Sequence, residues 1–322
     1  MTDTQNEVFK TPVNKIRLFE HGAPGSQNLK LTRKYYTEDM PDGRVKHIVQ
    51  NITDPDIVPY IPDGIGNSTD RQRIPAVLII PGGAFRRLVY NFEGEDVAKW
   101  LNSMGIAAFV LECRLPSDEH DNAEDVPLID AMRAMRVIRG RAQEFGIDEA
   151  KIGVMGFSAG GFMAALLSTA YESDVYADYK YKDEYDKLSA RPDFAVCSYP
   201  VISIDDCIEA GKRYMSEEQV LERISDSKAK ILHKYNPDKL VRPDMPPVFI
   251  CETDDDRTTL SENSVGFYMA ARKAGVSAEL HIFRTGGHGY GCGDDFAQTG
   301  EWKVLFTKWI KSIAVSYTHL RA

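Results

Sequence analysis

Cysteine is scarce in this chain of 322 residues, and its pattern excludes two kinds of protein. The five cysteines are odd in number and form no CxxC pair or Cys/His spacing. They are Cys113, Cys197, Cys207, Cys251 and Cys292. A disulfide framework needs paired cysteines, and a structural zinc site needs closely spaced cysteines and histidines. The sequence therefore predicts a protein of the reducing cytoplasm that holds no metal.

Excess positive charge and long hydrophobic runs are missing as well. The chain has 39 Lys and Arg against 48 Asp and Glu, a formal net charge of −9. Such a field repels nucleic acid and anionic membranes. No run of about 18 apolar residues occurs, and the first residues, MTDTQNEVFKTPVNK, lack the apolar stretch of a signal peptide. We expect no nucleic-acid partner and no segment that spans or enters a membrane.

The chain also lacks internal repeats and low-complexity linkers, and we interpret residues 1–314 as one domain. Short apolar runs bounded by turn residues recur, and several are apolar on both faces, as buried parallel strands are. They are AVLII (76–80), IAAFVLEC (106–113), KIGVMG (151–156), FAVCSYP (194–200), PPVFICE (246–252) and AELHIF (278–283). Helical stretches such as PLIDAMRAMRVIRGRAQEFG lie between them. This alternation predicts an α/β fold with a mostly parallel, doubly wound sheet.

Two regions depart from this alternation. Before Ala76, the segments KLTRKYY, VKHIVQN and DIVPYIP are broken by Pro, Gly and Asp, which predicts extended segments that pair antiparallel at one edge of the sheet. Between about residues 202 and 245, SEEQVLERISDSKAKILHKY has helical periodicity and a Ser-x-x-Gln start. We predict a small helical cap insertion there.

The last eight residues, VSYTHLRA at 315–322, follow the amphipathic segment EWKVLFTKWIKSIA. By the genetic code they read as the translation of a transposon-type sequencing adapter. Our hypothesis is that the gene was assembled from environmental reads and that adapter translation replaced the native last residues. A natural tail is the alternative.

One serine stands between two glycines in GVMGFSAGGF, residues 153–162. The G-x-S-x-G pattern is short, but here KIGVMG reads as a strand and GFMAALLSTAY as a helix. In this strand–turn–helix context the turn projects the serine Oγ above the sheet edge. The glycines allow a sharp turn in which a Cβ would clash. We therefore interpret Ser158 as a nucleophile rather than a structural turn residue.

A serine nucleophile needs an adjacent base that is itself oriented by an acid. In α/β-hydrolases the chain order is Ser, then Asp or Glu, then His. His288 lies in RTGGHGYG, directly after AELHIF, whereas His281 lies within that strand and is interpreted as structural. The acid is one of three neighbours in TDDDRTT, namely Asp254, Asp255 or Asp256, on the loop after VFICE.

Ester hydrolysis also needs hydrogen-bond donors for the oxyanion that forms on the substrate. The residue after the nucleophile, Ala159, offers one backbone amide. PGGAF follows the strand AVLII, where lipases and esterases carry a glycine-rich motif, so the amides of Gly83 and Ala84 are the other candidates. A phosphate cradle is the alternative, but PGGAF lacks the Lys and Ser/Thr of a P-loop.

Several of these segments together resemble bacterial α/β-hydrolases of the acetylxylan-esterase-like group, whose members are often described as feruloyl or xylanase-associated esterases. The segments are PGGAF, CRLP (113–116), IDEAKIGVMGFSAGGFMAA, ARPDFAVCSYPVIS, and ENS with AELHIFRTGGHGYG, within about residues 74–313. The resemblance implies an α/β-hydrolase fold and a serine carboxylesterase that acts on acyl groups attached to sugars. We expect no cofactor.

Three segments depart from the pattern of these relatives. Pro81 stands where many have histidine, Ala84 where some have a third glycine, and Phe162 where histidine is frequent. Relatives read Asp-Pro-Val-Val-Pro where this chain has Asp-Arg-Thr-Thr-Leu from residue 256. Alignment on the following ENS makes Asp256 the acid, with Asp255 as the alternative.

The sequence thus predicts hydrolysis of a small-molecule or oligosaccharide ester, with acetyl or related acyl groups on carbohydrates, through an acyl-Ser158 intermediate. Peptide or amide hydrolysis of the oligopeptidase type uses the same residues and is the alternative. The sequence shows no amino-terminal propeller and only a small cap, which favours esters. A non-catalytic binding protein on this fold is disfavoured, because it would be expected to lose a member of the triad.

Overall fold

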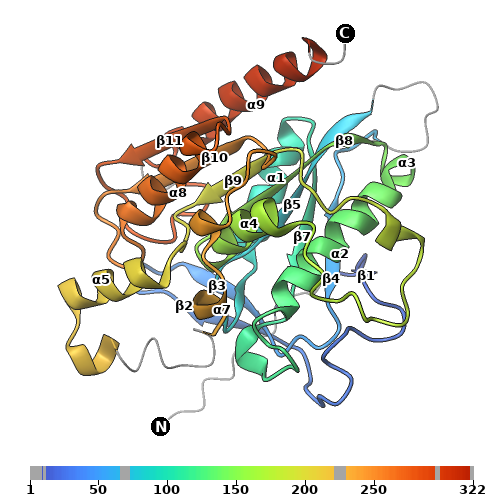
Figure 1. The fold of residues 1–322 in the computed structure, drawn as a ribbon, viewed down its shortest axis with the longest axis horizontal. Helices are drawn as coiled ribbons and strands as arrows, with labels where there is room; N and C mark the ends of the chain where they lie inside the picture. The colour runs from blue at the N-terminus through green and yellow to red at the C-terminus, as the bar shows by residue number, and fades with distance from the viewer. Residues whose placement is uncertain (1–8, 10–11, 66–72, 221–229, 294–297, 320–322) are drawn as a thin grey trace.

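The computed structural model describes residues 9, 12–65, 73–220, 230–293 and 298–319, and an eight-stranded sheet runs through it (Figure 1). The strand order is β1-β4-β7-β5-β8-β9-β10-β11. All neighbours from β7 to β11 are parallel, while β4 pairs antiparallel with β7 and β1 with β4. The strands are β1 Ile16–Arg17, β4 Asp56–Tyr60, β5 Ile74–Ile80, β7 Ala107–Glu112, β8 Ile147–Phe157, β9 Ala195–Ser198, β10 Val248–Thr253 and β11 Ala278–Phe283. The predicted α/β-hydrolase fold class is confirmed.

Helices cover both faces of the sheet. Helices α2, α4 and α8 each connect a strand to a later parallel strand in the direction of β11, whereas α1 connects β5 to β7 in the opposite direction. Because such crossovers are right-handed, α1 lies on the face of the sheet opposite to α2, α4 and α8. Helix α9 lies beside α1, with the Trp100 and Trp302 rings 4.9 Å apart. The helices are α1 Asp96–Ser103, α2 Val126–Gly140, α3 Ala142–Phe145, α4 Ala159–Ala170, α5 Ile204–Tyr214, α7 Lys230–Lys234, α8 Ser261–Lys273 and α9 Glu301–His319. Shorter helical turns are η1 Asn91–Glu95, η2 Pro116–Asp118, η3 Glu184–Lys187 and η5 Pro237–Lys239.

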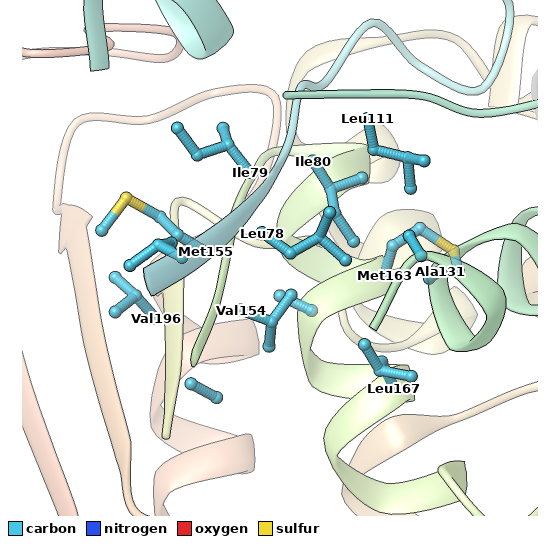
Figure 2. Packing of buried hydrophobic residues seen from close by; sticks show 14 of the residues in the cluster. Leu78, Ile79, Ile80, Leu111, Ala131, Val154, Met155, Met163, Leu167 and Val196 are labelled. Atoms are coloured by element: carbon cyan, nitrogen blue, oxygen red, sulfur yellow. The ribbon is translucent and has the colours of Figure 1, made fainter. Parts of the chain in front are cut away.

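The central strands are apolar on both faces because each face is covered by helices. Figure 2 shows Leu78, Val154 and Leu111 on the side of Met163 and Leu167, which belong to α4. Ile79, Met155 and Val196 point to the other side of the sheet (Figure 2). All of these strand side chains are fully buried. Burial on both faces fixes the sheet and therefore the loops at its carboxyl edge.

The amino-terminal segments only partly follow the prediction. Strand β4 lies at the antiparallel edge of the main sheet, as expected. Strands β2 Lys34–Asp39 and β3 Val45–Gln50 instead form a separate three-stranded sheet with β6 Leu88–Val89. Strand β6, which pairs with β3, follows PGGAF, so this small sheet anchors the end of that loop.

The predicted helical insertion contains α5, α7 and η5, and residues 221–229 within it lie outside the described part. At the carboxyl end, α9 continues to His319 and so includes the first residues of VSYTHLRA, while residues 320–322 are not described. Among the described residues, no helix has the length and apolar character needed to cross a membrane.

Two glycine-to-alanine substitutions test the packing of this fold. A Cβ on Gly160 would lie 1.9 Å from the Ile80 carbonyl oxygen, whereas a Cβ on Gly266, in α8, would meet nothing within 4 Å. We expect Gly160→Ala to lower the free energy of unfolding by at least about 1 kcal/mol. Gly266→Ala should raise it by about 0.5–1 kcal/mol, as alanine does in an exposed helix. Urea unfolding measures both, and a wild-type midpoint for Gly160→Ala would contradict the packing described.

Candidate active site

Ser158 lies on the sharp turn between β8 and α4. Its backbone has φ 53° and ψ −117°, a conformation that residues other than glycine rarely adopt. A Cβ on Gly156 would lie 1.9 Å from the Gly160 carbonyl oxygen, so the two glycines of the motif allow the strand and helix to meet. The serine is 8% exposed at the carboxyl edge of the sheet. It therefore lies on the turn between strand and helix that the sequence pattern indicates.

His288 reaches Ser158 from the loop after β11. The Ser158 hydroxyl donates to His288 Nε2 at 2.8 Å, across 130 residues of sequence. The histidine side chain is 22% exposed, so one side of the ring is open. His281, in contrast, lies in β11 and pairs with Glu279 at 2.7 Å. The structure therefore brings His288, and not His281, to the serine.

Asp256 accepts a hydrogen bond from the other side of the same imidazole. His288 Nδ1 donates to Asp256 Oδ2 at 2.7 Å. The amides of Thr258 and Thr259 donate to Asp256 Oδ1 at 2.7 and 3.0 Å. Burial alone would raise the pKa of Asp256, but the hydrogen bond and charge of His288, together with these amides, hold it below its ordinary value. The buried acid therefore stays ionised and fixes the histidine ring.

The two neighbouring aspartates have other contacts. Asp255 Oδ1 accepts the amide hydrogens of Gly286 and Gly287 at 2.9 and 2.8 Å, directly before His288. Asp254 lies 3.5 Å from the Ser261 hydroxyl. Of the three aspartates, only Asp256 contacts the imidazole, which agrees with the assignment based on ENS. Asp255 holds the backbone of the histidine loop instead, a contact that the sequence analysis missed.

The PGGAF loop passes close to the serine turn. A Cβ on Gly82 would lie 2.9 Å from the Ser158 Cβ and 2.5 Å from the Phe157 carbonyl oxygen, so only glycine fits. Gly83 and Ala84 follow with φ 136° and 56°, and Ala159 begins α4. Within the part of the chain that the structure describes, no protein acceptor takes the amide hydrogens of Gly83, Ala84 or Ala159. These amides are the ones predicted to bind an oxyanion.

An apolar cavity lies behind this loop. Its volume is about 10 Å³, roughly the space that one water molecule needs. The lining residues include Gly82, Phe85, Leu115, Ala159 and Met163. The cavity wall includes Ala159, which follows Ser158 in the chain, and it has room for about one water-sized group.

Phe162 lies under the serine turn, where the sequence analysis noted the absence of histidine. Its side chain is fully buried and its ring packs edge-on against Phe85 at 5.6 Å. The region behind the serine is therefore apolar. Among the described residues, no cluster of His, Cys, Asp and Glu could hold a metal ion.

Two further residues near the site, Glu93 and Tyr199, were missed because they contact each other across 106 residues of sequence. Glu93 accepts the amide hydrogen of Gly82, and Tyr199, after β9, donates to Glu93. The only sequence signals were an acid within the aromatic segment VYNFEGEDVA and a tyrosine at a strand end.

Comparison with known sequences shows which family this chain is similar to. Residues 65–270 match the family model described as BD-FAE. An acetylxylan esterase of Xylanibacter ruminicola is 31% identical over 240 residues, which are 74% of this chain and 45% of that protein. Endo-1,4-beta-xylanase B of Butyrivibrio fibrisolvens is 31% identical over 227 residues, which are 70% of this chain and 34% of that protein. This chain thus spans less than half the length of either relative.

Solved structures support the same relationship. An acetyl ester-xyloside bifunctional hydrolase from Caldicellulosiruptor lactoaceticus is 37% identical with a TM-score of 0.65, covering 82% of this chain and 90% of its own. The carboxylesterase Cest-2923 from Lactobacillus plantarum, 20% identical with a TM-score of 0.66, covers 88% of this chain and 98% of its own and shares the fold. The BD-FAE model covers more than half of the residues, and the chain therefore belongs to the BD-FAE family of α/β-hydrolases.

Proposed function

We propose that this protein is a serine carboxylesterase that removes acyl groups from carbohydrate esters, with acetyl esters as its main substrates. The observation that carries the proposal is the hydrogen-bonded line from Asp256 through His288 to Ser158, with distances of 2.7 and 2.8 Å. The substrate class is supported by the acetylxylan esterase and the acetyl ester-xyloside hydrolase to which the chain is similar.

The geometry supports acyl transfer in two steps. Ser158 Oγ attacks the ester carbon as His288 Nε2 takes the hydroxyl proton, and Asp256 stabilises the resulting imidazolium. The amides of Gly83, Ala84 and Ala159 donate to the oxyanion. His288 then gives the proton to the departing alcohol, which leaves acyl-Ser158. Water, deprotonated by His288, attacks that ester, and the carboxylic acid departs as the serine regains its proton.

The small cavity favours a short acyl chain. Its wall includes Gly82, next to the proposed oxyanion amide of Gly83, and Ala159, and it has room for about one water-sized group. A methyl group fits such a space, whereas a longer chain would have to displace buried side chains such as Met163. We therefore propose acetyl rather than feruloyl esters as the substrates.

Ser158→Ala should abolish hydrolysis of p-nitrophenyl acetate, because the nucleophile is lost while a small side chain remains at the turn. We expect kcat to fall by about 10⁴-fold or more. Thermal unfolding serves as the control for an intact fold. A variant that keeps a tenth of the activity would show that Ser158 is not the nucleophile.

Three asparagine variants test the role of each aspartate. Asp256→Asn should lower kcat by about 10³- to 10⁴-fold, because an amide cannot hold His288 in the required tautomer. Asp255→Asn keeps an oxygen that can accept from Gly286 and Gly287, and Asp254 contacts no reacting group. Each of these two substitutions should therefore lower kcat by less than about tenfold. Steady-state kinetics of the three variants decide the matter. A collapse of Asp255→Asn with an active Asp256→Asn would reverse the assignment.

A substrate panel tests the acyl group and the bond type. With p-nitrophenol as the common leaving group, kcat/KM should be about tenfold or more higher for acetate than for butyrate, because each buried methylene must be accommodated. Acetylated xylo-oligosaccharides should be hydrolysed, and a feruloyl ester only slowly. Faster cleavage of an aminoacyl anilide than of any ester would instead identify an oligopeptidase-like enzyme.

A further inference from the structure

A second carboxyl group, Glu93, is buried beneath the candidate active site. It is 5% exposed and lies in η1, the π-helical turn that precedes α1. The Glu95 amide donates to the Tyr90 carbonyl oxygen at 2.8 Å. This hydrogen bond joins residues five apart, which is the spacing of a π-helix. Single π-helical turns are rare and frequently occur at functional sites. Here the turn directs an acidic side chain into the protein.

Each oxygen of Glu93 receives a hydrogen bond from a different loop of the site. The Gly82 amide donates to Oε2 at 2.8 Å, and the Tyr199 hydroxyl donates to Oε1 at 2.9 Å. Gly82 directly precedes the proposed oxyanion amide of Gly83. The carboxyl group therefore contacts the loop whose placement decides where that amide points.

Tyr199 extends the contact to the loop that carries His288. Its hydroxyl accepts the amide hydrogen of Gly291 at 3.1 Å, and its ring lies edge-on to the His288 ring at 5.1 Å. The Thr259 hydroxyl lies 3.3 Å from the Tyr199 carbonyl oxygen and 3.0 Å from Asp256 Oδ2, and these two acceptors share its one hydrogen. With φ 37°, Tyr199 adopts a backbone conformation that is costly for a residue other than glycine. Such a conformation persists only where surrounding contacts enforce it.

The charge of Glu93 is consistent with this arrangement. Burial raises the pKa of Glu93 above its ordinary value, while the charge of His288 and the hydrogen bonds from Tyr199 and Gly82 act in the opposite direction. The two hydrogen bonds that Glu93 accepts favour its ionised form and oppose the effect of burial. A carboxylate here also attracts the imidazolium that forms when Ser158 attacks.

We infer that Glu93 is a positioning residue, whose buried carboxyl group fixes the PGGAF loop, residues 81–85, through Gly82 and the loop that carries His288 through Tyr199. This inference rests on the proposed ester hydrolysis. Glu93 touches no reacting atom and acts through these two partners. It joins three segments of the site that are far apart in sequence.

Glu93→Gln is the central test, because glutamine keeps the shape but cannot accept both hydrogen bonds. Misplaced donors cost about 10²-fold in such sites. We expect kcat for p-nitrophenyl acetate to fall by about 10- to 100-fold while KM changes less than about threefold. Glu95→Gln is the matched control, since Glu95 lies in the same turn and pairs with Lys99 at 2.7 Å. It should stay within about twofold of wild type.

Tyr199→Phe separates the contact of Glu93 with Tyr199 from its contact with Gly82. It removes the hydroxyl while Glu93 can still accept from Gly82, so its loss should be smaller than that of Glu93→Gln. If Glu93 acts through Tyr199, the double variant should lose less than the product of the two single losses. Losses that multiply fully would show independent roles and contradict the inference.

Titration with a fluorophosphonate, which labels reactive serines, counts the folded active sites in each preparation, and each rate is divided by that number. A Glu93→Gln enzyme with wild-type kcat per titrated site would overturn the inference and reduce Glu93 to a stability role. A wild-type protein inactive on all esters would instead refute the proposed function. The two failures are thus distinguishable.

Discussion

The close approach of three backbone segments at the carboxyl edge of the sheet constrains the whole site. The end of β5, the turn after β8 and the first turn of α4 meet so tightly that a Cβ on Gly160 would lie 1.9 Å from the Ile80 carbonyl oxygen. This contact exists because glycine stands at each crossing. It sets the spacing between Ser158 and the amides after Gly82. The buried strands on either side keep this spacing fixed, because neither face of the sheet can yield without exposing its core.

Buried carboxyl groups gather around this crossing, and each has several partners. Asp256 accepts from His288 and from the turn of Thr258 and Thr259. Glu93 accepts from two loops. An unpaired buried carboxylate would be very costly, whereas a fully bonded one holds its donors in place. The buried carboxyl groups therefore hold irregular loops in place through hydrogen bonds.

The sequence was sufficient for the parts of the site that depend on local pattern. Ser158 and His288 stand out because glycines beside a strand end mark a turn, and turns after parallel strands meet at one edge of the sheet. Asp256 required an alignment, because three neighbouring aspartates have the same local signal. Glu93 and Tyr199 meet across 106 residues, and no local pattern encodes that contact. The cytoplasmic location and the adapter origin of the last residues stay predictions.

The small sheet of β2, β3 and β6 was missed for a related reason. Its segments alternate as an edge of the main sheet would, but β6 holds only two residues and gives no sequence signal. Pairing of Ile48 with Val89 decides where the hairpin lies. The hairpin therefore supports the end of the PGGAF loop, residues 81–85, instead of extending the edge.

Backbone strain is concentrated where the loops leave the sheet. Ser158 follows β8, Tyr199 follows β9, and Ala84 and Phe85 follow β5, and all four have positive φ between 37° and 59°. Each such residue costs about 1–3 kcal/mol. The cost is offset by burial in the strands directly before them, where Phe157, Ser198 and Ile80 are at most 1% exposed. A sheet buried on both faces can hold strained residues at its ends, and these are the positions at which a side chain or an amide must point out of the regular structure toward a substrate.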